Sequence, residues 1–199
     1  MSGCSVSYVF NVGRLARLET VRRGDAPREF FFGALELQSR GWKVSCFETD
    51  AEFSPGGVGF LFDKMLIQGW LPEKMSAGLI SQVYRLLPSL NRQDVIVGTT
   101  SGIGFALALF HRIGLFRKPF IVIHCGLLNN PYNSFRRWAT KILLKQSNTI
   151  LYGEGEYYPF RDLWPGIEDL VTVNQFGVDV AFWSPDPKVA REPFILSVG

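Results

Sequence analysis

The 199-residue chain is 47% hydrophobic, enough apolar side chain for one compact domain with its own core. Its formal net charge is only +3 and no run of Lys and Arg forms a basic arm, so the composition argues against nucleic-acid binding. Three widely spaced cysteines without a C-x-x-C pair argue against a zinc site or a disulfide framework and fit a reducing cytoplasm. No signal peptide is recognisable, and the longest apolar run, residues 102–110, is too short to span a membrane.

Short runs of β-branched and aromatic residues alternate with longer helical patterns, which predicts parallel strands joined by helices. The expected strands lie at residues 5–12, 42–48, 94–99, 119–125, 148–153 and 170–176. The expected helices lie at residues 26–41, 60–90, 101–114, 134–146 and 156–164. Asp25 is the expected cap of the first helix, which has Pro27 in its first turn and ends at Gly41, and Pro72 breaks the second. The pattern predicts a Rossmann-like three-layer α/β/α fold with a parallel sheet.

Ligands of such sheets bind outside the carboxyl ends of the strands, so the loop after the first strand is a candidate phosphate site. Gly13 and Gly24 give its backbone freedom, while Arg22, Arg23 and the helix N-terminus behind Asp25 offer positive charge. The length of the loop favours binding, because long loops in compact domains are usually functional. The alternative is a solvated basic loop in which Asp25 only caps the helix.

A second candidate is the glycine-containing turn "VGTTSGIG", which resembles the cofactor loop of short-chain dehydrogenases. Its glycines, Gly98, Gly102 and Gly104, would bring backbone N–H groups to a pyrophosphate in an NAD(P)-dependent oxidoreductase. However, the turn does not follow the first strand, and the chain has no Tyr-x-x-x-Lys pair. Close packing of a helix on the sheet also requires glycines and is the favoured explanation. Ser101 stands in G-x-x-S-G, which is not the nucleophile elbow of a hydrolase.

A third candidate is His124, which ends the apolar strand "PFIVIHC" and precedes Gly126. An imidazole at the end of so apolar a strand requires a polar partner, and it is either a satisfied structural histidine or a functional group. His111, in contrast, falls within a predicted helix and is expected to serve packing or the surface.

Read in order, several motifs resemble one family. They are "SRGWKVSCFE", "DVIVGT", "VIHCG", "NTILYGEGEYY", "FGVD" followed by "FWSP", and the terminal "PFILSVG". Their order and spacing resemble the N-terminal half of a retaining, group 4 glycosyltransferase with the GT-B fold. The resemblance implies an acceptor-side domain at residues 1–183, a linker at 184–193, and at 194–199 the first strand of a nucleotide-sugar-binding domain that this sequence does not contain.

The resemblance also implies the chemistry. A sugar passes from a nucleotide-sugar to a glycan, lipid-linked or small-molecule acceptor with retained configuration, and no metal or other cofactor is expected. His124 matches the histidine that lies against the donor sugar and its phosphates, and Gly24, or else Gly13, matches the glycine of the first loop. The remaining positions expected around the donor phosphates or the acceptor are Arg22, Arg23, Asp25, Ser101, Gly102, Gly126 and Glu154.

The resemblance also implies that the reaction takes place in a cleft between the two domains. Because this sequence holds only one of them, the 199 residues alone are expected to transfer no sugar. A non-catalytic interaction domain is a further alternative. The segment 134–146 combines basic and aromatic residues and is either a peripheral contact with an anionic membrane or, as favoured, an ordinary helix that covers the sheet.

Overall fold

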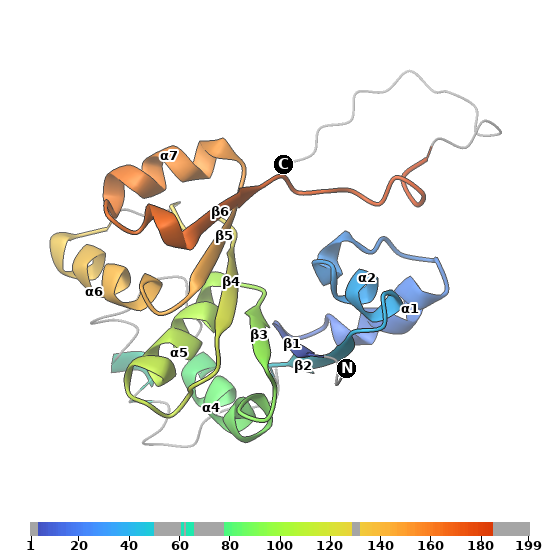
Figure 1. The fold of residues 1–199 in the computed structure, drawn as a ribbon, viewed down its shortest axis with the longest axis horizontal. Helices are drawn as coiled ribbons and strands as arrows, with labels where there is room; N and C mark the ends of the chain where they lie inside the picture. Colours follow the sequence, from blue (N-terminus) through green and yellow to red (C-terminus); the bar gives the residue numbers. More distant parts are fainter. Residues whose placement is uncertain (1–3, 50–60, 62, 66–77, 129–131, 185–199) are drawn as a thin grey trace.

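The computed structural model describes residues 4–49, 61, 63–65, 78–128 and 132–184 (Figure 1). Six parallel strands form one sheet in the order β2-β1-β3-β4-β5-β6. The strands are β1 Ser5–Phe10, β2 Lys43–Glu48, β3 Val95–Gly98, β4 Phe120–His124, β5 Asn148–Tyr152 and β6 Val171–Asn174. The predicted Rossmann-like α/β fold and all six predicted strands are therefore confirmed.

Helices cover both faces of the sheet, as Figure 1 shows. They are α1 Leu18–Arg22, α2 Ala34–Ser39, α4 Leu79–Leu90, α5 Ser101–Arg112, α6 Ser134–Leu144 and α7 Glu154–Leu163, with short 3-10 turns η1 Leu15–Arg17, η2 Glu29–Phe31 and η3 Glu168–Leu170. Residues of α4, α5, α6 and α7 share one core cluster with the side chains of one sheet face, and α1, η2 and α2 pack on the other. Alternate residues of a strand point to opposite faces, so Val122 and His124 face α5 whereas Ile123 faces α2.

The segment after β1 differs from the expected loop and capped helix. It contains η1 and α1, so only short turns are irregular. Asp25 caps no helix: it is exposed beside Arg23, 3.6 Å from its guanidinium, and the next turn begins without a side-chain cap. Phe32 and Gly33 both adopt positive φ, 51° and 83°, which splits the expected helix into η2 and α2.

The end of that helix is as predicted. Gly41 has φ of +83° and follows the last turn of α2. Its N–H donates to Gln38 O at 3.0 Å and the N–H of Trp42 donates to Leu37 O at 3.1 Å, a paired arrangement that satisfies the final carbonyl groups. The predicted break at Pro72, most of the linker and the final strand lie outside the described residues.

Candidate functional site at the carboxyl edge of the sheet

The direction of strand connection reverses between β1 and β3. These strands are neighbours, yet the helices after β1 pack on one face of the sheet and α5, after β3, packs on the other. Such a reversal opens a crevice at the carboxyl ends, where ligands of open parallel sheets bind. Across it, the Thr100 hydroxyl lies 3.4 Å from Asn11 Oδ1, and the Thr99 hydroxyl donates to Val9 O at 2.8 Å.

Helix α5 begins at this crevice. Thr100 is its N-cap and accepts a hydrogen bond from the N–H of Ile103 at 3.5 Å. The N–H groups of Ser101 and Gly102 precede the first intrahelical hydrogen bond, which runs from Gly104 to Thr100 O. This end of the helix therefore presents backbone donors and the positive end of the helix dipole.

One glycine of this turn, Gly104, is required by packing. A Cβ at Gly104 would lie 2.2 Å from Cγ1 of Val122, and one at Gly98 would lie 3.4 Å from Ile103. Gly104 thus allows α5 to lie directly on β4. The favoured explanation of the glycines, close helix–sheet packing, holds at Gly104.

His124 lies beneath the first turn of α5. Its side chain is buried, its ring centroid lies 5.5 Å from that of Phe105, and its Nδ1 lies 3.0 Å from the Ser101 hydroxyl. Nε2 is buried and has no hydrogen-bond partner among the described residues. Burial lowers the pKa of His124 to about 3, so the ring is neutral at physiological pH.

Ser101 controls which nitrogen of this neutral ring carries the proton. When its hydroxyl donates to Nδ1, Nε2 carries the hydrogen and is a donor; when it accepts, Nε2 is an acceptor. An unsatisfied buried nitrogen is costly, which is a reason to look for a ligand at Nε2. His124 and Ser101, nominated separately from the sequence, are in direct contact.

The loop after β4 is held by Glu156 rather than by Glu154. Oε1 of Glu156 accepts the N–H of Gly126 at 2.9 Å, and its Oε2 is buried without a partner among the described residues. Glu154 is exposed and borders a depression of about 720 Å³ beside the end of β6. The residue that contacts the loop of His124 is therefore Glu156, and not Glu154, the glutamate expected near the donor phosphates or the acceptor.

The first loop differs from the expected phosphate cradle. Glu48, the last residue of β2, accepts the N–H groups of Arg14 and Leu15 with one carboxylate oxygen, the latter at 3.2 Å. Gly13 does take a left-handed conformation, with φ of +87°. Nevertheless, a side-chain anion already occupies the backbone donors that follow it.

The other first-loop candidates lie apart from His124. Arg22 pairs with Glu19 at 2.8 Å. Burial raises the pKa of Cys46 in β2, and the charge of Arg22 only partly opposes this shift. Strands β2 and β4 are three strand spacings apart, about 14 Å, and Arg22 and His124 lie on opposite faces of the sheet. Arg23, Gly24 and Asp25 follow Arg22 at the end of α1 and are exposed.

The segment "FGVD" closes the same edge from the side of β6. Asp179 begins a short turn: its carbonyl oxygen accepts the N–H groups of Phe182 and Trp183 at 3.1 and 2.9 Å, and its Oδ1 caps the turn by accepting the N–H of Phe182 at 3.3 Å. This segment borders a cavity of about 510 Å³ with α2 and the ends of β4 and β5.

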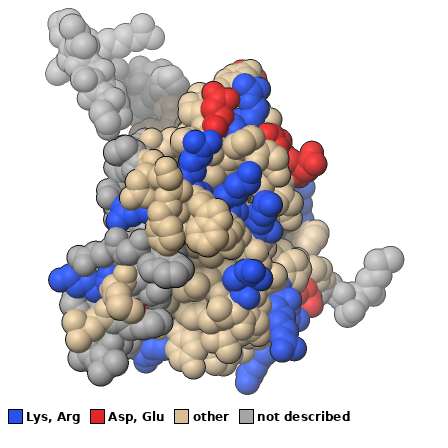
Figure 2. Space-filling view, turned by 90° about the vertical axis from the view of Figure 1, so that its left-hand side faces the viewer, with Lys and Arg blue, Asp and Glu red and all other residues tan. Residues whose placement is uncertain are grey.

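Helix α6 covers the sheet with one side and exposes another. Its residues Ala139, Leu143 and Leu144 are buried, as favoured from the sequence, but Phe135 and Trp138 are 44% and 56% exposed. Their ring centroids lie 5.8 Å apart. Figure 2 shows many Lys and Arg side chains, and few Asp and Glu, on the side of the molecule that includes this helix.

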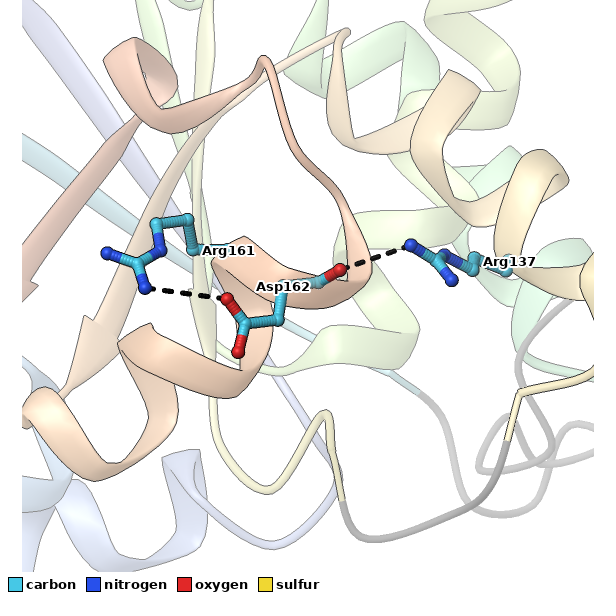
Figure 3. Close-up of polar contacts among 3 residues, drawn as sticks. All are labelled: Arg137, Arg161 and Asp162. Atoms are coloured by element: carbon cyan, nitrogen blue, oxygen red, sulfur yellow. Dashed lines mark hydrogen bonds and ion pairs between the residues drawn. The ribbon is translucent and has the colours of Figure 1, made fainter.

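Two of the basic residues of α6 stabilise the end of α7. Arg137 donates to the carbonyl oxygens of Leu163 and of Asp162, the latter at 3.1 Å, and Lys141 donates to Pro165 O. Figure 3 shows Arg137 directed at the backbone of Asp162 while Arg161 pairs with its carboxylate. The positive side chains donate to the last carbonyl oxygens of the helix, which have no partner within the helix. They also interact favourably with the negative end of the helix dipole.

Fold and site together define an α/β protein with a Rossmann-like parallel sheet and a buried histidine at its carboxyl edge. Among the described residues, no group of three potential ligands could hold a metal ion, and no helix is long and apolar enough to cross a membrane.

No protein-family model and no curated protein matches the sequence. Among solved structures, the crystal structure of UDP-N-acetylglucosamine 2-epimerase is similar, with a TM-score of 0.44 and 14% identity over 86% of this chain. The match covers 48% of that chain, so this sequence spans about half the length of the solved protein. At this level of similarity, the functional assignment rests on the residues of the chain itself.

Proposed function

We propose that the chain is the acceptor-side half of a retaining glycosyltransferase that uses a nucleotide-sugar donor. The observation that carries the proposal is His124, buried at the carboxyl end of β4 with Nδ1 held by Ser101 and Nε2 without a partner among the described residues. The order of the sequence motifs, from "SRGWKVSCFE" to "FGVD", supports the same family.

In this proposal His124 is a hydrogen-bond donor. Because burial keeps the ring neutral, with a pKa of about 3, it transfers no proton at physiological pH. With the Ser101 hydroxyl donating to Nδ1, the Nε2–H group is fixed before the reaction and can stabilise negative charge that develops on the departing phosphate. The free N–H groups at the start of α5 offer further donors for the same charge.

Nucleotide-sugar binding tests the proposal with the chain as it is. A panel of UDP-, GDP- and ADP-sugars is compared with NAD⁺ and NADP⁺ by thermal unfolding. A single domain of the pair should bind the nucleotide-sugar weakly. If the dissociation constant is about 1 mM, free ligand at ten times that concentration would stabilise the fold by about 1.4 kcal/mol. We expect at least one nucleotide-sugar, and neither dinucleotide, to raise Tm.

The His124→Ala variant should lose this shift, and Ser101→Ala should reduce it without a large change in the ligand-free Tm. The matched control is His111→Ala, which alters the other histidine of the chain, near the C-terminal end of α5. A shift with NAD⁺ or NADP⁺ alone would support the oxidoreductase alternative instead. No shift with any nucleotide-sugar, or one that persists in His124→Ala, would contradict the proposal.

A lipid-linked acceptor is the form of this function that α6 supports. The exposed aromatic pair Phe135 and Trp138 stands on a helix that also carries Arg136 and is followed by Lys145, a combination suited to the interface of an anionic membrane. We expect the chain to sediment with phosphatidylserine vesicles and less with phosphatidylcholine vesicles. The Phe135→Ser/Trp138→Ser variant should stay in the supernatant, whereas Tyr84→Ser, which alters an aromatic of α4 with 57% exposure, should sediment as before. Equal sedimentation of both variants would leave α6 as a helix that only covers the sheet.

A further inference from the structure

The cavity beside α2 has the dimensions of a small-molecule site. Its volume is about 510 Å³, within the range of about 300–1,000 Å³ that is usual for ligand pockets. Its floor is the sheet face at Ile123, Ile150 and Tyr152, and its walls are the start of α2 and residues 174–181. Figure 1 shows that last segment running from β6 toward the α1 and α2 side of the molecule. The site lies on the sheet face opposite His124.

Reciprocal hydrogen bonds hold the outer wall in place. Oε2 of Glu29 accepts the N–H of Asp179 at 3.3 Å, and Oε1 accepts the indole N–H of Trp183 at 2.8 Å. In the other direction, the carboxylate of Asp179 accepts the N–H of Arg28 at 3.3 Å. The two carboxylates therefore fasten the segment 174–181 to η2, and the cavity is a built feature of the fold.

Aromatic rings dominate one side of the cavity. Phe176 packs edge-on against Tyr152 at 5.2 Å between ring centroids and against Phe32 at 6.4 Å. Phe176 is 41% exposed, so part of its ring remains available to a ligand. A pyranose ring has one apolar face of C–H groups, which packs well on such an aromatic surface.

Polar groups surround these rings. The amides of Asn174 and Gln175 and the hydroxyl of Tyr152 border the cavity, and none of these side chains makes a hydrogen bond within the described part of the chain. Burial raises the pKa of Tyr152 to about 12, so its hydroxyl remains a donor at every physiological pH. Amides and a phenol both donate and accept, as do the hydroxyl groups of a sugar.

The charge of the lining disfavours phosphorylated ligands. Three carboxylates, from Glu29, Glu36 and Asp179, face one basic side chain, that of Arg28. Two of these carboxylates are already hydrogen-bonded within the wall, but their charge persists and opposes an anion. We propose that this cavity binds an uncharged saccharide, with one sugar ring packed on Phe176 and its hydroxyl groups hydrogen-bonded to Tyr152, Asn174 and Gln175.

This inference goes beyond the proposed transferase, because binding of a glycoside in this cavity requires neither a nucleotide-sugar nor His124. Saturation-transfer NMR tests binding directly, using methyl glycosides of glucose, mannose, galactose and N-acetylglucosamine without any nucleotide. We expect at least one of them to bind with millimolar affinity. Phe176→Ala should weaken that binding about tenfold, since stacking on the ring is lost, and Tyr152→Phe should weaken it less. The control is Phe135→Ala on α6, which removes a phenylalanine of similar exposure, 44%, and should leave binding unchanged.

Charge is tested with glucose 6-phosphate and with choline. Both should bind more weakly than the best methyl glycoside. Binding of none of the glycosides, equal loss in Phe176→Ala and Phe135→Ala, or tighter binding of the phosphate or the cation would each overturn the saccharide assignment. The two proposals can fail separately. If a glycoside binds but no nucleotide-sugar raises Tm, the transferase proposal is contradicted and the saccharide site remains. If a nucleotide-sugar raises Tm but no glycoside binds, only the saccharide site is contradicted.

Discussion

Replacing Gly104 with alanine is expected to destabilise the fold by about 2–3 kcal/mol, although alanine is the better helix former by about 1 kcal/mol. The new methyl group would lie 2.2 and 2.8 Å from the two γ-carbons of Val122 and 3.0 Å from its Cβ. Val122 is buried in the centre of the sheet, so neither it nor α5 can move without opening the core. Urea unfolding should show a lower midpoint with an unchanged slope.

Gly155→Ala is the matched control. Gly155 also lies in a helix, the first turn of α7, and an added Cβ would meet nothing within 4 Å. Its backbone has no positive φ, so alanine should stabilise the protein by about 0.5–1 kcal/mol. If alanine lowers the free energy of unfolding at position 104 and raises it at position 155, the glycine at 104 is required by its contact with Val122 and not by helix propensity. A stabilised Gly104→Ala protein would contradict the close approach of α5 to β4.

This outcome bears on the resemblance to dehydrogenases. In "VGTTSGIG" the spacing of glycines is the same whether they approach a pyrophosphate or a strand, so the motif alone does not distinguish the two. The contact at Gly104 shows that one of the glycines is required by the packing of α5 on β4. The dehydrogenase alternative therefore needs independent support from dinucleotide binding.

The sheet was predictable because each strand carries its own signal. Runs such as residues 94–99 and 119–125 are apolar, β-branched and bounded by polar or turn residues, and parallel strands buried on both faces have this composition. The division of segment 26–41 into η2 and α2 was not predictable, because the helical periodicity of the sequence continues through Phe32 and Gly33. Their positive φ values depend on packing against the sheet, where Phe31 and Ala34 are both buried.

The candidate site was predictable in part. His124 and Ser101 stood out as polar residues next to predicted strand ends, and parallel strands bring such ends to one edge. Glu48 also ends a predicted strand, but the sequence does not show that its carboxylate accepts hydrogen bonds from the first loop, so it was missed. The aromatic cavity depends on contacts between Phe32 and Phe176, more than 140 positions apart in the chain, for which no local pattern exists.

Acidification from pH 7.5 to pH 5 is expected to destabilise the wild-type chain by about 2 kcal/mol through His124 alone. Burial lowers the pKa of this imidazole from 6.5 to about 3 in the folded state. Below pH 6.5 the unfolded chain takes up a proton that the native state refuses, so the free energy of unfolding falls as pH decreases. The loss continues until the pH approaches 3, where the native imidazole also titrates.

The His124→Gln variant isolates this contribution, since its amide can still contact Ser101 but does not titrate. Urea unfolding of both proteins at pH 7.5 and pH 5 should show a smaller loss in the variant, by about 2 kcal/mol, while carboxylates such as Asp94, whose pKa is lowered by hydrogen bonds from Ser5, affect both proteins equally. His111→Gln should retain the full wild-type dependence. If His124→Gln loses as much stability as the wild type, the imidazole is accessible to protons in the native state. Its proposed role as a fixed neutral donor would then fail, because a charged ring would be free to act as an acid.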